Sequence, residues 1–110
     1  MVYQDILTIR EQLKSTLNQW ETLGEIWANK KASAESIKAR RVLELKDSGL
    51  SATIIDKIIK GDPQVNQAIF DMDIAKVKYD NAYEAINILK KDFDFLREQY
   101  SREWSQAGRD

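Results

Sequence analysis

The stretch ELKDSGLSATIIDKIIKGDPQV, residues 44–65, holds two of the four glycines of the chain and its single proline. Gly49 predicts the end of a helix, because glycine readily takes the left-handed conformation common at that position. Ser51 predicts the N-cap of a short helix over 52–60, and Gly61 predicts its end. This part of the chain is therefore expected to be a connection that contains one short helix.

A second long helix is predicted over 63–105, with Asp62 as its N-cap and Pro63 at its first position. Apolar residues then recur every seven residues, a period that no strand produces. At 1.5 Å per residue, the helix would be a rod on the order of 60 Å long. The repeat consists of Val65, Met72, Tyr79, Ile86, Phe93 and Tyr100, with Ala68, Ala75, Ala82, Leu89 and Leu96 three residues further on.

The first half of the chain shows the same period and predicts a helix over 3–46. Gly24 and the small residues near 32–34 are its weakest points, because glycine costs about 1 kcal/mol relative to alanine inside a helix. We favour a continuous or once-bent helix, and a kink or break near 29–36 is the alternative. The repeat consists of Ile6, Leu13, Trp20, Trp27 and Ala34, with Ile9, Leu23 and Ile37 at the second position.

The predicted fold is all-α: an antiparallel hairpin of two long coiled-coil-like helices with a short helix at its tip, forming one domain over 1–110. Pairing the two helices symmetrically about the tip places residues whose numbers sum to about 109 opposite each other. This register predicts that Trp27 faces the neighbourhood of Ala82 and that Trp20 faces Leu89. Such hairpins are expected to associate into a multi-helix bundle.

The second long helix carries more apolar side chains than a two-helix hairpin can bury. Each is worth roughly 1.5 to 3 kcal/mol when fully buried, so a second exposed stripe indicates an interface. Self-association into a dimer or higher oligomer is the favoured interpretation, ahead of a different protein partner and of a contact within the chain. The stripe consists of Phe70, Ile74, Val77, Ile88 and Phe95.

The short tip helix is amphipathic but broadly apolar. It is interpreted first as a lid over the open end of the bundle, since apolar residues usually belong to the core. A docking surface for a partner is the alternative. The residues concerned are Leu50, Ile54, Ile55, Ile58 and Ile59.

Residues 30–60 carry eight basic and four acidic side chains, while the chain as a whole has a net charge of −1. Lysine and arginine gathered on one surface can bind nucleic-acid phosphates without any particular fold. A solvated helix face is the simpler interpretation, and both are kept. The candidate contacts are Lys30, Lys31, Lys38, Arg40, Arg41, Lys57 and Lys60.

The composition argues against catalysis. There is no Cys and no His, which excludes thiol nucleophiles, the commonest general base and the commonest metal ligand. The acidic residues are interpreted as solubilising charge and as partners in helix-stabilising pairs such as Asp56 with Lys60 and Glu98 with Arg102. We expect no enzyme activity, no cofactor, no metal, no membrane span and a cytoplasmic location.

The short helical chain has no His or Cys, a central ELKDSGLSATIIDKIIKGDPQV and a closing REQYSREW. In these features the protein resembles small uncharacterised α-helical accessory proteins of phages and prophages of Gram-positive bacteria. The resemblance implies a protein made in the host cytoplasm that acts on phage DNA metabolism or on a host factor. The predicted function is a non-enzymatic, oligomeric coiled-coil binding or scaffolding protein with a host or phage protein as partner. The alternative is a nucleic-acid-binding accessory factor of phage replication or recombination.

Overall fold

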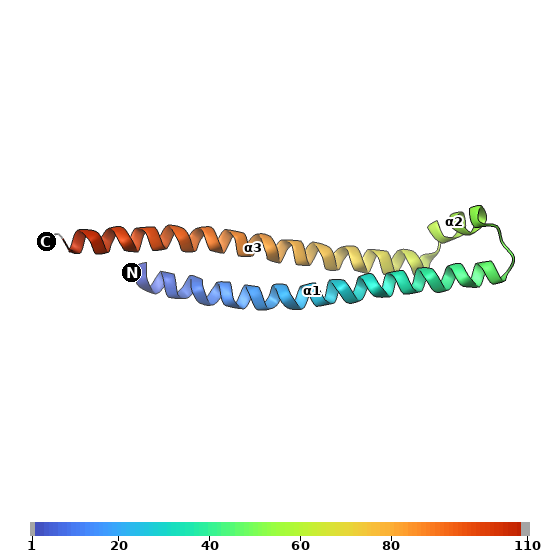
Figure 1. Ribbon diagram of the computed structural model, residues 1–110, viewed down its shortest axis with the longest axis horizontal. Coiled ribbons are helices and arrows are strands. Elements are labelled where there is room, and N and C mark those ends of the chain that lie inside the picture. The colour runs from blue at the N-terminus through green and yellow to red at the C-terminus, as the bar shows by residue number, and fades with distance from the viewer. Residues whose placement is uncertain (1, 109–110) are drawn as a thin grey trace. The chain divides into compact units, whose positions relative to one another are not determined.

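The computed structural model describes residues 2–108 and consists of three helices. They are α1 (Val2–Asp47), α2 (Ala52–Lys60) and α3 (Pro63–Ala107). Figure 1 shows α2 between the end of α1 and the start of α3. The predicted all-α class and the order of the helices are confirmed, with helix ends at most two residues from those expected. α1 is unbroken through residues 29–36, so the predicted alternative of a break there is wrong.

Contacts divide the chain into two compact units, Met1–Thr22 with Asp80–Asp110, and Leu23–Tyr79. In each unit, a part of α1 lies antiparallel to a part of α3, as the hairpin prediction requires. The single domain over 1–110 remains a prediction, and residues 1, 109 and 110 lie outside the described part of the chain.

The turn and cap residues act as their types predict. Gly49 has a φ of 83°, the left-handed conformation in which a side chain would be strained, and its N–H donates to the carbonyl of Lys46 at 2.9 Å. Ser51 is the N-cap of α2, and its hydroxyl accepts a hydrogen bond from the N–H of Ile54 at 3.4 Å. Gly61 is the C-cap of the same helix.

Asp62 caps the start of α3. Although it is charged, this residue is buried, with 8% of its surface exposed. Its Oδ1 accepts hydrogen bonds from the N–H groups of Gln64 at 2.9 Å and Val65 at 3.0 Å. These are donors that a helix start otherwise leaves without a partner. Because Pro63 has no N–H, nothing is lost at the first helical position.

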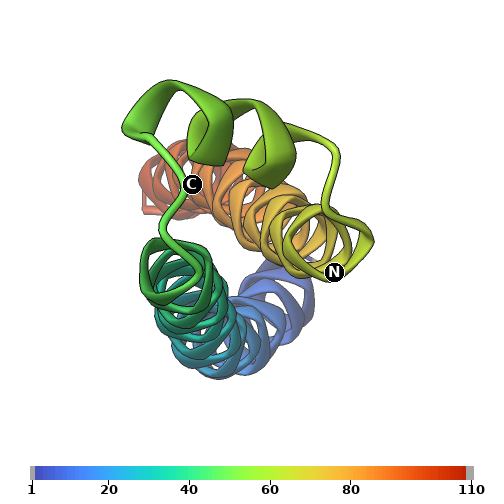
Figure 2. The same cartoon turned by 90° about the vertical axis from the view of Figure 1, so that its right-hand side faces the viewer.

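The core of the Leu23–Tyr79 unit lies where α2 meets the two long helices. Figure 2, which looks along α1 and α3, shows α2 lying across their ends. The 4% and 6% exposure of Ile55 and Ile59 on α2 shows that this helix closes the core. The buried cluster consists of Leu45, Ile55, Ile59 and Val65, with Ile37, Val42, Leu50 and Ile58 packed partly buried against it.

The other unit has a thinner core along the predicted heptad seam. In this unit Ile86 is buried, and most other seam residues are half-buried. The ring of Trp20 packs against that of Tyr83, with 5.7 Å between ring centroids. The predicted register had Trp20 opposite Leu89, six residues further along α3, and is wrong here.

The register also differs in the Leu23–Tyr79 unit. The ring of Trp27 lies 5.3 Å from that of Tyr79, three residues before the predicted Ala82. The ion pair between Arg41 and Asp62, whose Nε and Oδ2 are 2.8 Å apart, shows the same offset. The start of α3 lies beside Arg41, six positions before the end of α1, so the two helices do not pair symmetrically about the tip.

Candidate interaction surface

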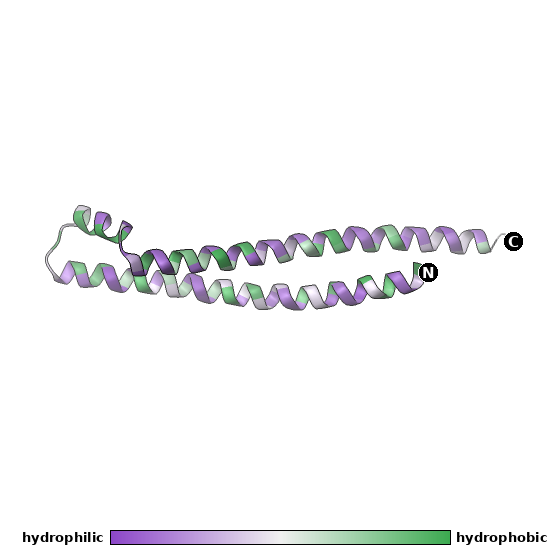
Figure 3. Ribbon diagram, turned by 180° about the vertical axis from the view of Figure 1, so that it is seen from behind, coloured by the Kyte–Doolittle hydropathy of each residue, from purple (hydrophilic) through white to green (hydrophobic). Residues whose placement is uncertain are grey.

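The predicted second stripe is exposed on α3. In the Leu23–Tyr79 unit, Phe70, Ile74 and Val77 have exposures of 58%, 41% and 57%. Their spacing of four and three residues places them on one side of the helix. The seam residue Ala75 is buried on another side. Figure 3 shows frequent apolar residues on α3 over the turns that follow α2.

A groove between α1 and α3 borders this stripe. Its apolar lining comes from Leu23 and Ile26 on α1 and from Ile74 and Ala75 on α3. The sequence did not predict the contribution of Ile26, because this residue lies next to Trp27 and outside the α1 heptad seam. The charged residues at the groove are Lys30, Asp71 and Lys78.

The remaining two residues of the stripe lie in the other unit. Ile88 and Phe95 have exposures of 58% and 61%, so they too present apolar surface to solvent. Tyr3 and Tyr100 in the same unit form a ring pair with centroids 5.9 Å apart.

The structure divides the five predicted docking residues of the tip. Ile55 and Ile59 are buried in the core cluster, and Leu50 and Ile58 pack against it. Only Ile54 of these five has an exposed side chain, at 47%. This placement favours the lid interpretation over a docking surface made by the whole helix.

Two of the seven predicted nucleic-acid contacts hold ion pairs. Arg41 is half-buried and donates to Asp62 and, through Nη1, to Glu44 at 3.1 Å. Lys60 lies 3.3 Å from Asp56, which confirms that predicted i,i+4 pair. Arg41 is thus held as a link between α1 and the start of α3, a role that a separation of 21 residues in sequence did not reveal. The other five are exposed: Lys30, Lys31, Lys38, Arg40 and Lys57.

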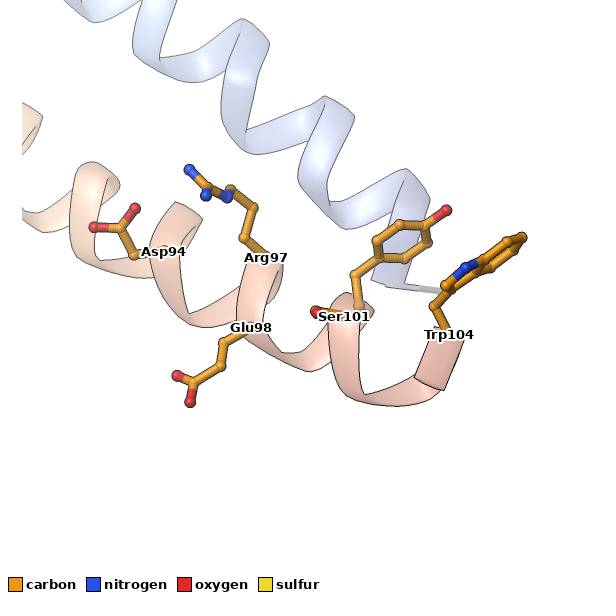
Figure 4. A pocket seen from close by; sticks show the side chains of 6 residues that line it. Asp94, Arg97, Glu98, Ser101 and Trp104 are labelled. Carbon is orange, nitrogen blue, oxygen red and sulfur yellow. The ribbon is translucent and has the colours of Figure 1, made fainter. Parts of the chain in front are cut away.

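A shallow hollow lies on α3 near its C-terminal end. Figure 4 shows Arg97 pointing toward the ribbon of α1 and Glu98 pointing away from it. Glu98 pairs with Arg102 at 2.8 Å, as the spacing predicts. Among residues 2–108, the lining side chains all come from α3. The lining consists of Asp94, Arg97, Glu98, Tyr100, Ser101 and Trp104.

The acidic residues are spread over the helices. Within residues 2–108, no three His, Cys, Asp or Glu side chains gather into a group that could hold a metal ion. No helix in the same residues has the length and apolar character needed to cross a membrane.

No protein-family model, curated protein or solved structure matches the chain. The likeness to phage accessory proteins therefore rests on the sequence features alone and remains a prediction.

Proposed function

We propose that this protein is a non-enzymatic helical binding or scaffolding protein that works as a homo-oligomer. The observation that carries the proposal is the exposure of Phe70, Ile74 and Val77 on one side of α3. Full burial of such a side chain is worth roughly 1.5 to 3 kcal/mol. A contiguous patch of three, next to an apolar groove, is therefore typical of an interface.

The packing of the hairpin supports the same proposal. Two helices can cover each other along one side only, and the large seam residues Trp20 and Trp27 are accordingly half-buried. Antiparallel helix pairs commonly complete their cores by forming four-helix bundles. The net charge of −1 adds little repulsion between copies of the chain. The proposed setting, a phage accessory protein that also binds a host or phage protein, rests on the sequence resemblance.

The test is size-exclusion chromatography with light scattering on the unmodified protein and on a Phe70→Ser, Val77→Ser double variant. We expect the unmodified protein to elute as an oligomer and the double variant to shift toward the mass of one chain. Leu43→Ser is the matched control, since Leu43 is equally exposed, at 60%, but lies on α1. A monomeric unmodified protein, or equal oligomers for all three proteins, would contradict the proposal.

Binding of nucleic acid is the second candidate function. The supporting observation is that Lys31 and Lys38 are exposed and seven residues apart, which places them on one side of α1 near Lys30. Phosphate contacts of this kind weaken steeply as salt rises, whereas apolar contacts do not. Salt-sensitive co-elution with short single-stranded or double-stranded DNA, lost in a Lys31→Glu, Lys38→Glu variant, would support it. Equal elution with and without DNA at low salt would rule it out.

A further inference from the structure

The charges around Ile74 are arranged in a fixed order along α3. In the segment FDMDIAKVK, residues 70–78, Asp71 and Asp73 precede Ile74, and Lys76 and Lys78 follow it. Asp71 and Lys78 both line the groove beside the exposed stripe, so they border the same side of the patch. Along α3, the groove side of the patch therefore has a negative half and a positive half, and Lys30 of α1 is the third charged residue of the groove.

The exposed apolar residues are spaced almost evenly about the same place on the helix. Phe70 lies four residues before Ile74 and Val77 three residues after it, and the two outer side chains are almost equally exposed, at 58% and 57%. Reversing the direction of the helix about the midpoint between Ile74 and Ala75 exchanges Asp71 with Lys78 and Asp73 with Lys76, and it brings Phe70 within two positions of Val77. A surface with this property is complementary to its own copy when the two helices run in opposite directions.

We propose that a second copy of the chain packs on this patch, with its α3 antiparallel to the first and a two-fold axis near Ile74. This inference deepens the proposed self-association and rests on it. Phe70 then packs against Val77 of the second copy, and Asp71 lies opposite Lys78 of the second copy. Each such pair occurs twice, because a two-fold contact is the same from both sides.

Charge complementarity selects this arrangement over a parallel one. With parallel helices in register, each acidic residue would lie opposite the same acidic residue, and each lysine opposite the same lysine. Like charges placed directly opposite are unfavourable. Leu23 and Ile26 in the groove add apolar surface from α1 next to Ile74, so the contact extends beyond a single helix.

Single-cysteine variants test the geometry, because the natural chain contains no Cys. Asp71→Cys and Lys78→Cys chains are mixed under reducing conditions and then oxidised. The antiparallel contact predicts a disulfide-linked dimer in the mixture and little in either variant alone. In the antiparallel contact, residue 71 of one chain and residue 71 of the other are seven residues apart along the helices, about 10 Å, and the same holds for residue 78. A disulfide needs Cα atoms closer than about 7 Å.

Charge substitutions give a second measurement that does not depend on crosslinking. We expect Lys78→Asp to weaken association roughly tenfold, since it replaces two attractive pairs by two repulsive ones. Adding Asp71→Lys in the same chain should restore association, because the opposite charges again meet. Lys38→Asp is the matched control, an exposed lysine on α1 outside the groove lining, and should change association little.

The outcomes separate this inference from the proposed function. Dimers linked in the mixture, together with restored association in the double charge variant, support the antiparallel contact. The antiparallel contact is wrong if the protein is an oligomer but each cysteine variant crosslinks as well alone as in the mixture. It is also wrong if the double charge variant associates as weakly as Lys78→Asp. Either result leaves self-association standing. A monomeric unmodified protein overturns both.

Discussion

At the scale of single residues, Asp62 joins the start of α3 to α1. Its carboxylate accepts hydrogen bonds from the start of α3 and from Arg41 on α1. The N–H of Val65, followed by the Arg41 side chain, lowers the pKa of Asp62 below its ordinary value. A lowered folded-state pKa means that the charged form stabilises the fold. This contribution is complete above the unfolded value near 3.9 and is lost as the pH falls through the folded value.

The prediction is that Asp62→Asn lowers the free energy of unfolding at pH 7 and that its difference from the unmodified protein shrinks below about pH 4. Urea unfolding followed by circular dichroism at pH 7 and pH 3 measures both quantities. Asp56→Asn is the control, since Asp56 forms an exposed ion pair with Lys60 and should have little effect. If Asp62→Asn lowers the free energy of unfolding equally at pH 7 and pH 3, the charged carboxylate of Asp62 does not stabilise the fold as proposed.

Gly49 and Gly61 differ in backbone conformation. We therefore expect substitution by alanine to change the free energy of unfolding differently at the two positions. Gly49 has a φ of 83°, and an alanine there should cost about 1–2 kcal/mol of stability. Gly61 has a φ of −99°, and a Cβ built on it comes no closer than 3.8 Å to another atom. We expect Gly61→Ala to be close to neutral in the same urea experiment. Equal losses for the two variants would be the contrary result.

Residue types predicted the capping residues well, because a cap depends on a few neighbouring positions. Gly49, Ser51 and Asp62 all act as expected. The partner of Arg41 was not predictable in this way, since the ion pair depends on how the chain folds back between two distant positions. From its charge and its neighbours alone, Arg41 is a candidate nucleic-acid contact or part of a solvated helix face.

At the scale of the elements, α2 holds the core of its unit together. Ile59 is buried on α2 and Ile54 is exposed on the same helix, so the two offer a matched comparison. We expect Ile59→Ala to lower the free energy of unfolding by about 2–5 kcal/mol. Ile54→Ala should cost far less, because its side chain is already largely in water. Similar losses measured by urea unfolding would contradict the lid role of α2.

The heptad period predicted which residues of α1 and α3 lie on the seam, but it did not fix their pairing. A seven-residue repeat looks the same after a shift of one repeat, so Trp20 could be matched to several partners on α3. Its observed neighbour, Tyr83, lies six residues from the predicted one. The pairing depends on where α3 starts beside α1, which the connection between them decides.

At the scale of the whole molecule, the central claim is that the outer face of α3 is covered by a second copy of the chain. The sequence predicted the exposed stripe because its residues repeat out of phase with the seam. It did not predict the groove, because Leu23 and Ile26 join Ile74 only through the folded pairing of the helices. The groove and three residues of the stripe, Phe70, Ile74 and Val77, belong to the same patch in the Leu23–Tyr79 unit.

Sedimentation equilibrium of the unmodified protein over a range of concentrations measures this self-association. We expect an average mass that rises with concentration toward a whole-number multiple of the single-chain mass. The Phe70→Ser, Val77→Ser variant should remain near the mass of one chain over the same range. A single-chain mass for the unmodified protein at every concentration would contradict the account.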